Sequence, residues 1–138
     1  MDDVIPHAPA TAIDDVFDHD GVMLNYRLQG DGPHTLVCIH GVGSYLEAWQ
    51  GTINALGGGF RVLTFDLRGH GRSSLVKGRY EIDDFVGDVL ALADHVGIAR
   101  FNLAGFSLGG LIAQRLALTH PERLDRLMRG WNHLRALW

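Results

Sequence analysis

A serine flanked by glycines is the residue of this sequence best placed to do chemistry. Ser107 lies in the run Gly105-Phe-Ser-Leu-Gly109, which matches the Gly-x-Ser-x-Gly pattern of a nucleophile elbow. In such an elbow, a sharp and strained turn exposes the serine oxygen to a substrate carbonyl. Glycines are favoured on both sides because the serine backbone is strained and the helix passes close to the neighbouring strand. We therefore predict that Ser107 attacks an acyl carbonyl.

The residues around Ser107 favour a strand, a turn and a helix in that order. Residues 101–104 form a short apolar run, as expected for a buried parallel strand. After the turn, apolar residues recur at helical spacing, at Leu108, Leu111, Ile112 and Leu116. An ordinary helix N-cap is the alternative interpretation of this serine. A cap does not need glycine at both offsets, so the context favours an elbow.

The rest of the chain predicts an α/β fold. Asp20-Gly21 separates two strand-like runs and predicts an antiparallel β-hairpin near the N-terminus. Beyond it, expected strands alternate with expected helices: strands at 35–39, 61–65 and 101–104, helices at about 46–56 and 82–96. This alternation predicts a mostly parallel sheet flanked by helices, with ligands at the carboxyl ends of its strands.

Composition narrows the classes of partner and cofactor. The 138 residues carry a formal charge of −4, which gives no general attraction to nucleic acid or anionic membranes. The N-terminus is acidic and contains prolines, unlike a signal or transit peptide. One cysteine, Cys38, lies in an apolar run, which fits a reducing cytoplasmic setting. No metal cluster, Walker loop or dinucleotide fingerprint is present in the sequence, so we expect no cofactor.

Four motifs together resemble the α/β-hydrolase fold superfamily, over about residues 14 to 127. They are His40-Gly-Val-Gly43, Asp66-Leu-Arg-Gly-His-Gly-Arg-Ser73, Gly105-Phe-Ser-Leu-Gly-Gly110 and His120-Pro-Glu-Arg123. They are most similar to those of the small hydrolases of carboxylic esters and lactones that resemble 3-oxoadipate enol-lactonase. The resemblance implies a small ester or lactone as substrate and an acyl-enzyme route. Carbon–carbon bond hydrolases and cofactor-free haloperoxidases share the motifs and are alternatives.

The resemblance also implies a role for each residue of the site. The backbone N–H groups of Val42 and Leu108 are expected to form the oxyanion hole. The elbow and its neighbouring loop are expected to be supported by His40, Gly41, Gly105 and Gly109. His40 is expected to organise this loop and not to act as the catalytic base.

The sequence departs from the family pattern after the elbow. A serine needs an adjacent base, and in this fold the acid and the histidine follow the serine along the chain. The sequence stops at Trp138, so we expect a truncated hydrolase that is weak or inactive. The division expected is a flexible N-terminus (1–13), the N-terminal part of the hydrolase core (14–128) and an atypical tail (129–138). His133 is the less favoured candidate for a substitute base, if residues 125–128 form a sixth strand beside the elbow strand.

Two further functional classes are open, and the oligomeric state can be anticipated. The same cleft could serve a non-catalytic module that binds a ligand or protein, or the chain could have no function of its own. An incomplete sheet would leave an unprotected edge, and we expect self-association through it.

Overall fold

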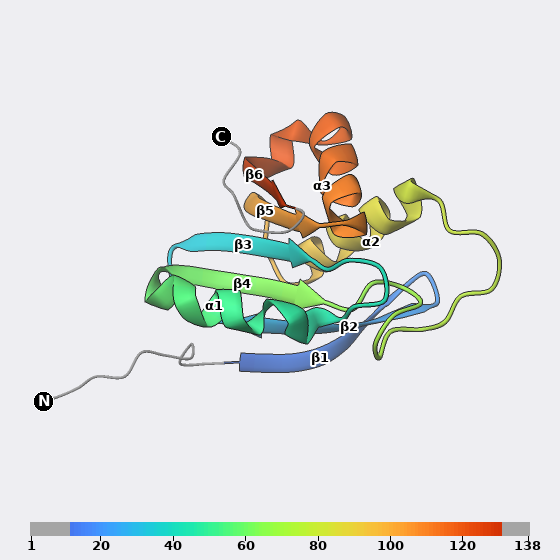
Figure 1. Cartoon of the computed structure of the whole chain (residues 1–138), viewed down its shortest axis with the longest axis horizontal. Helices are drawn as coiled ribbons and strands as arrows, with labels where there is room; N and C mark the ends of the chain where they lie inside the picture. The colour runs from blue at the N-terminus through green and yellow to red at the C-terminus, as the bar shows by residue number, and fades with distance from the viewer. Residues whose placement is uncertain (1–11, 131–138) are drawn as a thin grey trace, which may run out of the picture.

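The computed structural model describes residues 12–130, whose strands form one six-stranded sheet (Figure 1). The strands are β1 (Ala12–His19), β2 (Val22–Gln29), β3 (His34–Ile39), β4 (Phe60–Phe65), β5 (Phe101–Phe106) and β6 (Leu124–Gly130). Their order across the sheet is β1-β2-β4-β3-β5-β6. β1 and β2 run antiparallel to each other and β2 runs antiparallel to β4, whereas β4, β3, β5 and β6 are parallel. The predicted fold class is therefore confirmed.

The predicted hairpin joins β1 to β2. Asp20 has φ 50° and Gly21 has φ 90°, and two successive positive φ values define the type I′ turn that suits a two-residue hairpin. The Asp18 carboxylate accepts a hydrogen bond from the Gly21 N–H at 2.7 Å. The strands are longer than the sequence pattern indicated, because paired backbone continues into the alternating polar residues of β1.

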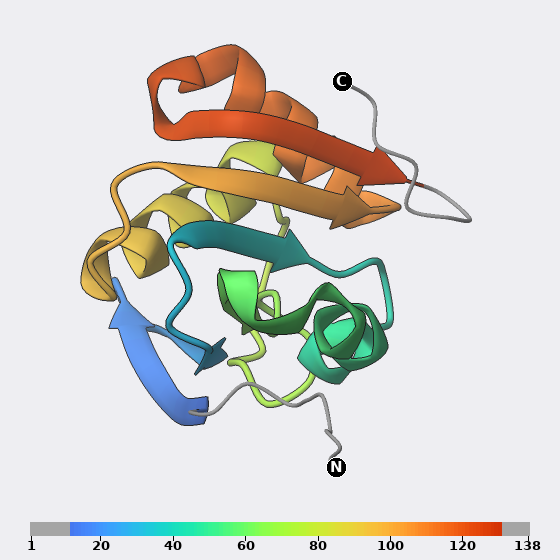
Figure 2. The same ribbon diagram turned by 90° about the vertical axis from the view of Figure 1, so that its left-hand side faces the viewer.

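The helices cover both faces of the sheet (Figures 1 and 2). They are η1 (Leu46–Trp49), α1 (Gln50–Leu56), η2 (Gly57–Gly59), α2 (Ile82–His95), α3 (Leu108–Thr119) and η3 (Pro121–Arg123). The helix expected at about 46–56 begins as a 3-10 turn, and Gly57 ends it with φ 76°. A capping box between Glu81 and Asp84 starts α2.

Two hydrophobic clusters lie on opposite faces of the sheet. Along β3, Val37 and Ile39 face the cluster under α2 and α3, while Leu36 and Cys38 face the cluster under η1 and α1. Successive side chains of a strand point to opposite faces. A strand covered by helices on both faces must therefore be apolar at every position, which explains the continuous apolar run of β3.

The register of the parallel strands places three loops at one edge of the sheet. Ile39, at the end of β3, pairs with Phe65 on β4 and with Gly105 on β5. The segments that begin at His40, Asp66 and Ser107 therefore lie at a common edge, as expected for a ligand site in an α/β sheet. Within residues 12–130 no helix has the length and apolar character needed to cross a membrane.

Candidate active site

Ser107 occupies a strained backbone position between β5 and α3. Its φ of 58° and ψ of −119° are outside the regions that residues with a side chain ordinarily adopt. The residue is exposed, and its side chain makes no capping hydrogen bond to α3. The N-cap interpretation is therefore unsupported, and the strand–turn–helix geometry of an elbow is what the structure shows.

The two glycines around Ser107 allow the elbow to form. A Cβ on Gly105 would collide with the Gly109 carbonyl, and a Cβ on Gly109 would collide with the Ile39 carbonyl. The first turn of α3 is thus pressed against the ends of β5 and β3. Because all of these clashes are with backbone, no side-chain movement could relieve them.

The loop after β3 packs directly on the elbow. A Cβ on Gly41 would lie 3.0 Å from Ser107 Cβ and 3.2 Å from Phe106 Cδ1. Val42 follows Gly41, and Leu108 follows Ser107. Among the hydrogen bonds of residues 12–130, none uses the backbone N–H of Val42 or Leu108. These two N–H groups therefore make no hydrogen bond within the described residues, and the loop that carries Val42 packs on the elbow.

His40 is fully committed to structure. The Leu67 N–H donates to His40 Nε2 at 3.0 Å, so Nε2 is an acceptor. The Gly41 carbonyl lies 2.7 Å from Nδ1 and can only accept, so Nδ1 carries the proton. Burial lowers the pKa of His40 and favours this neutral ring. With both nitrogens occupied, His40 has none left to receive a proton from Ser107.

Asp66 holds the end of the loop that follows β3, at Leu46. Its buried carboxylate accepts hydrogen bonds from the N–H of Leu46 at 2.7 Å, the N–H of Arg72 at 2.9 Å and Asn25 Nδ2 at 2.9 Å. Gly71 passes so close that a Cβ there would collide with the carboxylate. These contacts give Asp66 a structural role in its loop.

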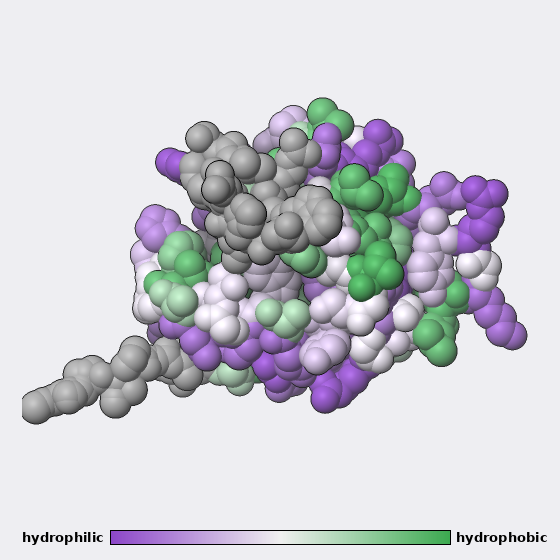
Figure 3. Space-filling model, in the orientation of Figure 1, coloured by the Kyte–Doolittle hydropathy of each residue, from purple (hydrophilic) through white to green (hydrophobic). Residues whose placement is uncertain are grey.

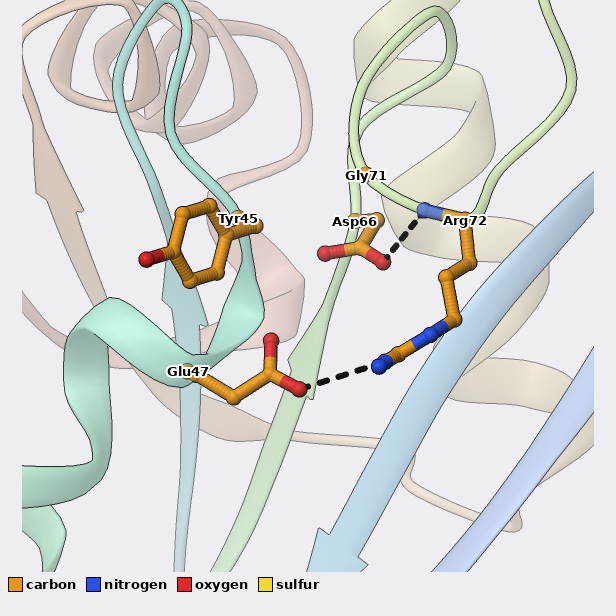
Figure 4. Close-up of a pocket in the computed structure, with 5 residues that line it drawn as sticks. All are labelled: Tyr45, Glu47, Asp66, Gly71 and Arg72. Atoms are coloured by element: carbon orange, nitrogen blue, oxygen red, sulfur yellow. Dashed lines mark hydrogen bonds and ion pairs between the residues drawn. The ribbon is translucent and has the colours of Figure 1, made fainter.

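A pocket of about 250 Å³ opens beside Asp66 (Figure 4). Its lining is Tyr45, Glu47, Asp66, Gly71 and Arg72. Glu47 and Arg72 form an ion pair of 3.2 Å at its mouth. Since Ser107 is not part of its lining, this pocket is separate from the elbow.

Comparison with known proteins agrees with this geometry. Residues 34–128 match the family model described as the alpha/beta hydrolase fold. The chain belongs to the α/β-hydrolase family.

Similar α/β-hydrolases include 3-oxoadipate enol-lactonase 2 of Acinetobacter baylyi, which is 37% identical over 122 residues. That match covers 87% of this chain and 45% of the relative. Among solved structures, the enol-lactonase of Burkholderia xenovorans has 39% identity and a TM-score of 0.79, covering 82% of this chain and 45% of its own. A hydrolase of Pseudomonas aeruginosa has the same identity and TM-score, with 83% and 44% covered. The chain thus spans less than half the length of these relatives.

Two further histidines of this α/β-hydrolase make contacts within the fold. His70 Nδ1 donates to the Arg68 carbonyl at 3.0 Å, and its ring lies 5.1 Å from that of His40. The His95 ring, at the end of α2, stacks on the Phe17 ring of β1 with 4.4 Å between the ring centroids. His133 lies outside the described residues. Within residues 12–130, no group of three His, Cys, Asp or Glu side chains is placed to hold a metal ion.

Hydrophobic side chains gather over the carboxyl end of β5 and the adjoining part of α3 (Figure 3). The exposed fractions are 71% for Val42, 39% for Phe106 and 61% for Leu111. Phe106 therefore belongs to the surface beside Ser107, whereas Trp49 is buried in the core.

One buried charge cluster was missed by the sequence reasoning. Asp88 on α2 is fully buried and binds Arg68 and His19. The signal was available: Asp88 lies three residues after Phe85 and four before Leu92, on the apolar face of the helix. A carboxylate at such a position requires a partner, because an unpaired buried charge is strongly unfavourable.

Proposed function

We propose that this chain carries the nucleophile and the oxyanion hole of a serine hydrolase for small carboxylic esters or lactones. The observation that supports the proposal most directly is the strained, exposed Ser107 with the Gly41 loop packed against it. A backbone held in this unfavourable region is typical of functional sites.

In the proposed mechanism, Ser107 Oγ attacks the acyl carbonyl and a base takes its proton. The carbonyl oxygen becomes negative and accepts hydrogen bonds from the N–H groups of Val42 and Leu108. The amino end of α3 adds a favourable dipole at the same place. Collapse of the tetrahedral intermediate expels the alcohol, leaving an acyl-enzyme that water then hydrolyses.

The described residues around Ser107 include neither the base nor its acid partner. His40 is occupied on both nitrogens, and no side chain of residues 12–128 is hydrogen-bonded to Ser107 Oγ. The relatives are more than twice as long as their matched parts. We therefore place the base in polypeptide beyond the described residues. Alone, the described part would retain only the contribution of the oxyanion hole and of binding.

The substrate class is proposed from the relatives and from the surface beside Ser107. The relatives named above include two enol-lactonases. Val42, Phe106 and Leu111 offer an apolar surface beside the serine, which suits the hydrocarbon part of a small acyl group. We also propose a cytoplasmic setting, because the single cysteine, Cys38, is a free buried thiol and the sequence offers no pair of cysteines for a disulfide.

A non-catalytic binding module is the second candidate. It is favoured by one specific observation, namely that Ser107 Oγ has no hydrogen-bonded base among the described residues. In that case the cleft beside the elbow would bind a ligand without turning it over.

A fluorophosphonate probe separates the two candidates. Because the base is placed outside the described residues, we expect the 138-residue chain to be labelled only slowly, with the help of the oxyanion hole. We expect Ser107→Ala to be unlabelled and Ser44→Ala to be labelled at the wild-type rate. Ser44 is a suitable control because it lies in the neighbouring loop and contributes a backbone hydrogen bond to Gly41. Absence of labelling in the wild type, together with retained binding of a small ester, would favour the binding module.

A further inference from the structure

A buried carboxylate on α2 binds two side chains, Arg68 and His19, from distant parts of the chain. Asp88 has none of its surface exposed. Arg68 approaches it in a bidentate manner, with Nε 2.7 Å from Oδ2 and Nη2 2.9 Å from Oδ1. His19 Nδ1, at the end of β1, donates to Oδ1 at 2.8 Å. The cluster thus ties the loop after β4 to both α2 and β1.

The geometry of the cluster makes Arg68 a rigid point in its loop. A guanidinium with two parallel hydrogen bonds to one carboxylate has a fixed orientation as well as a favourable energy. Its side chain is only 12% exposed, so water competes poorly for these bonds. The backbone on either side of Arg68 is therefore fixed relative to α2.

Arg68 lies next to the residue that holds His40. The Leu67 N–H donates to His40 Nε2 at 3.0 Å, and His40 Nδ1 donates to the Gly41 carbonyl at 2.7 Å. Gly41 in turn packs against Ser107. An unbroken series of contacts therefore runs from Asp88 to the loop beside the elbow.

Asp66, the neighbour of Leu67, holds the other end of the loop that follows β3. Asp66 accepts the Leu46 N–H at 2.7 Å. Residues 66–68 thus fix both ends of the segment that contains Val42, at His40 and at Leu46. The position of the Val42 N–H therefore depends on the position of residues 66–68, in the loop that follows β4.

We propose that Asp88 is a positioning residue for the oxyanion hole, acting through Arg68, Leu67 and His40. The inference rests on the proposed function of Ser107, since the Val42 N–H matters to chemistry only if an oxyanion forms there. Asp88 itself touches no substrate. Its role is to hold the donor within the narrow range of positions that oxyanion stabilisation demands.

Asp88→Asn tests the proposal in the 138-residue chain. The amide keeps the shape of the carboxylate but lacks the charge that holds Arg68 and His19. We expect the rate of fluorophosphonate labelling at Ser107 to fall about tenfold or more. We also expect the ¹⁵N resonances of the His40 ring to shift, because its hydrogen bond from Leu67 changes. The matched control is Leu92→Val on the same helix, which loosens the core without removing a hydrogen bond to Arg68 or to His40.

The outcomes distinguish positioning from stability alone. Slower labelling and shifted His40 resonances in Asp88→Asn, with both unchanged in Leu92→Val, support the proposal. Wild-type labelling and unchanged resonances in Asp88→Asn overturn it. If Asp88→Asn does not fold, Arg68→Lys serves instead, because it keeps the charge and loses the fork; the same two results then decide.

Failure of the proposed function would look different. If the wild-type chain itself is not labelled, Ser107 is not an activated nucleophile. The His40 resonances of Asp88→Asn still show whether Asp88 positions the loop that follows β3. Unchanged resonances would overturn this positioning role whether or not Ser107 is labelled.

Discussion

Ser107 carries an exposed hydroxyl on a strained backbone. The close packing of the nearby glycines keeps the backbone in this conformation. Gly105 and Gly109 lie against carbonyl groups that cannot move aside. The strain at the serine is therefore offset by close backbone packing, which only residues without a Cβ permit. The elbow should consequently respond to a single added methyl group.

Gly109→Ala should destabilise the fold by about 3 kcal/mol or more, since the methyl collides with the Ile39 backbone. Gly51→Ala is the matched control, because it is also a helical glycine but has nothing within 4 Å of an added Cβ. It should stabilise the fold by about 0.5–1 kcal/mol through helix propensity. Urea unfolding of both variants is the measurement, and similar effects would contradict the proposed packing.

The pH dependence of stability should report on His40. Its pKa is lowered in the folded state from an ordinary value of 6.5, mainly by burial. Below pH 6.5 the unfolded chain therefore binds a proton that the folded chain does not. Its contribution to stability is complete above pH 6.5 and is lost as the pH falls towards the folded pKa.

The test is to measure the free energy of unfolding from pH 7.5 to 5 for wild type, His40→Gln and His34→Gln. We expect His40→Gln to have a flatter profile, while His34→Gln, which changes an exposed histidine, keeps the wild-type slope. Asp14 also has a lowered pKa, but its ordinary value of 3.8 places its effect at more acidic pH. Identical slopes in all three proteins would refute the assignment.

At the scale of elements, the β1–β2 hairpin depends on one glycine for conformation alone. Gly21 has φ 90°, and an added Cβ would find nothing within 4 Å. Gly21→Ala should therefore cost about 1–2 kcal/mol through backbone strain without any steric clash. Gly58→Ala, also in open space, should change stability by less than about 0.5 kcal/mol. Thermal or urea unfolding compares the two, and equal costs would show that the turn tolerates a side chain.

Elements set by local chemistry were predictable from the sequence. Asp20-Gly21 specified its turn, because the requirement for positive φ is local. The glycines around Ser107 indicated the elbow through their motif, although Gly109 packs on the distant Ile39. The periodicity of α2 predicted its apolar face. The 3-10 start of the helix at Leu46 was not predicted; there Asp66 binds the Leu46 N–H from a distant loop.

Long-range arrangements were not predictable in the same way. The Asp88 cluster joins β1, α2 and the β4 loop, which lie up to 69 residues apart in the sequence. The strand order β1-β2-β4-β3-β5-β6 likewise depends on how the helices cover the two faces of the sheet, and no single segment determines it. For the site, pattern alone identified Ser107 and its neighbouring loop, whereas the residues that hold this loop in place became visible only with coordinates.

At the scale of the whole molecule, the two edges of the sheet differ in character. The β1 edge carries acidic side chains, including Asp14, Asp15 and Asp18, which oppose pairing with another strand. Within residues 12–130, β6 pairs with β5 on one side only. Near it, α3 exposes Leu111 and Leu118, at 61% and 72%. Apolar surface beside an unpaired edge favours association.

We therefore expect the 138-residue chain to self-associate through the β6 side. Sedimentation velocity over a range of concentrations should show dimers or larger species that dissociate on dilution. Lys substitution at both Leu111 and Leu118 should shift the distribution towards monomer, because two charges would have to be desolvated in the interface. Leu75→Lys is the control: Leu75 is 85% exposed but lies in the loop after β4, so its substitution should leave association unchanged. A wild-type chain that stays monomeric at all concentrations would mean that this side of the sheet is already adequately covered.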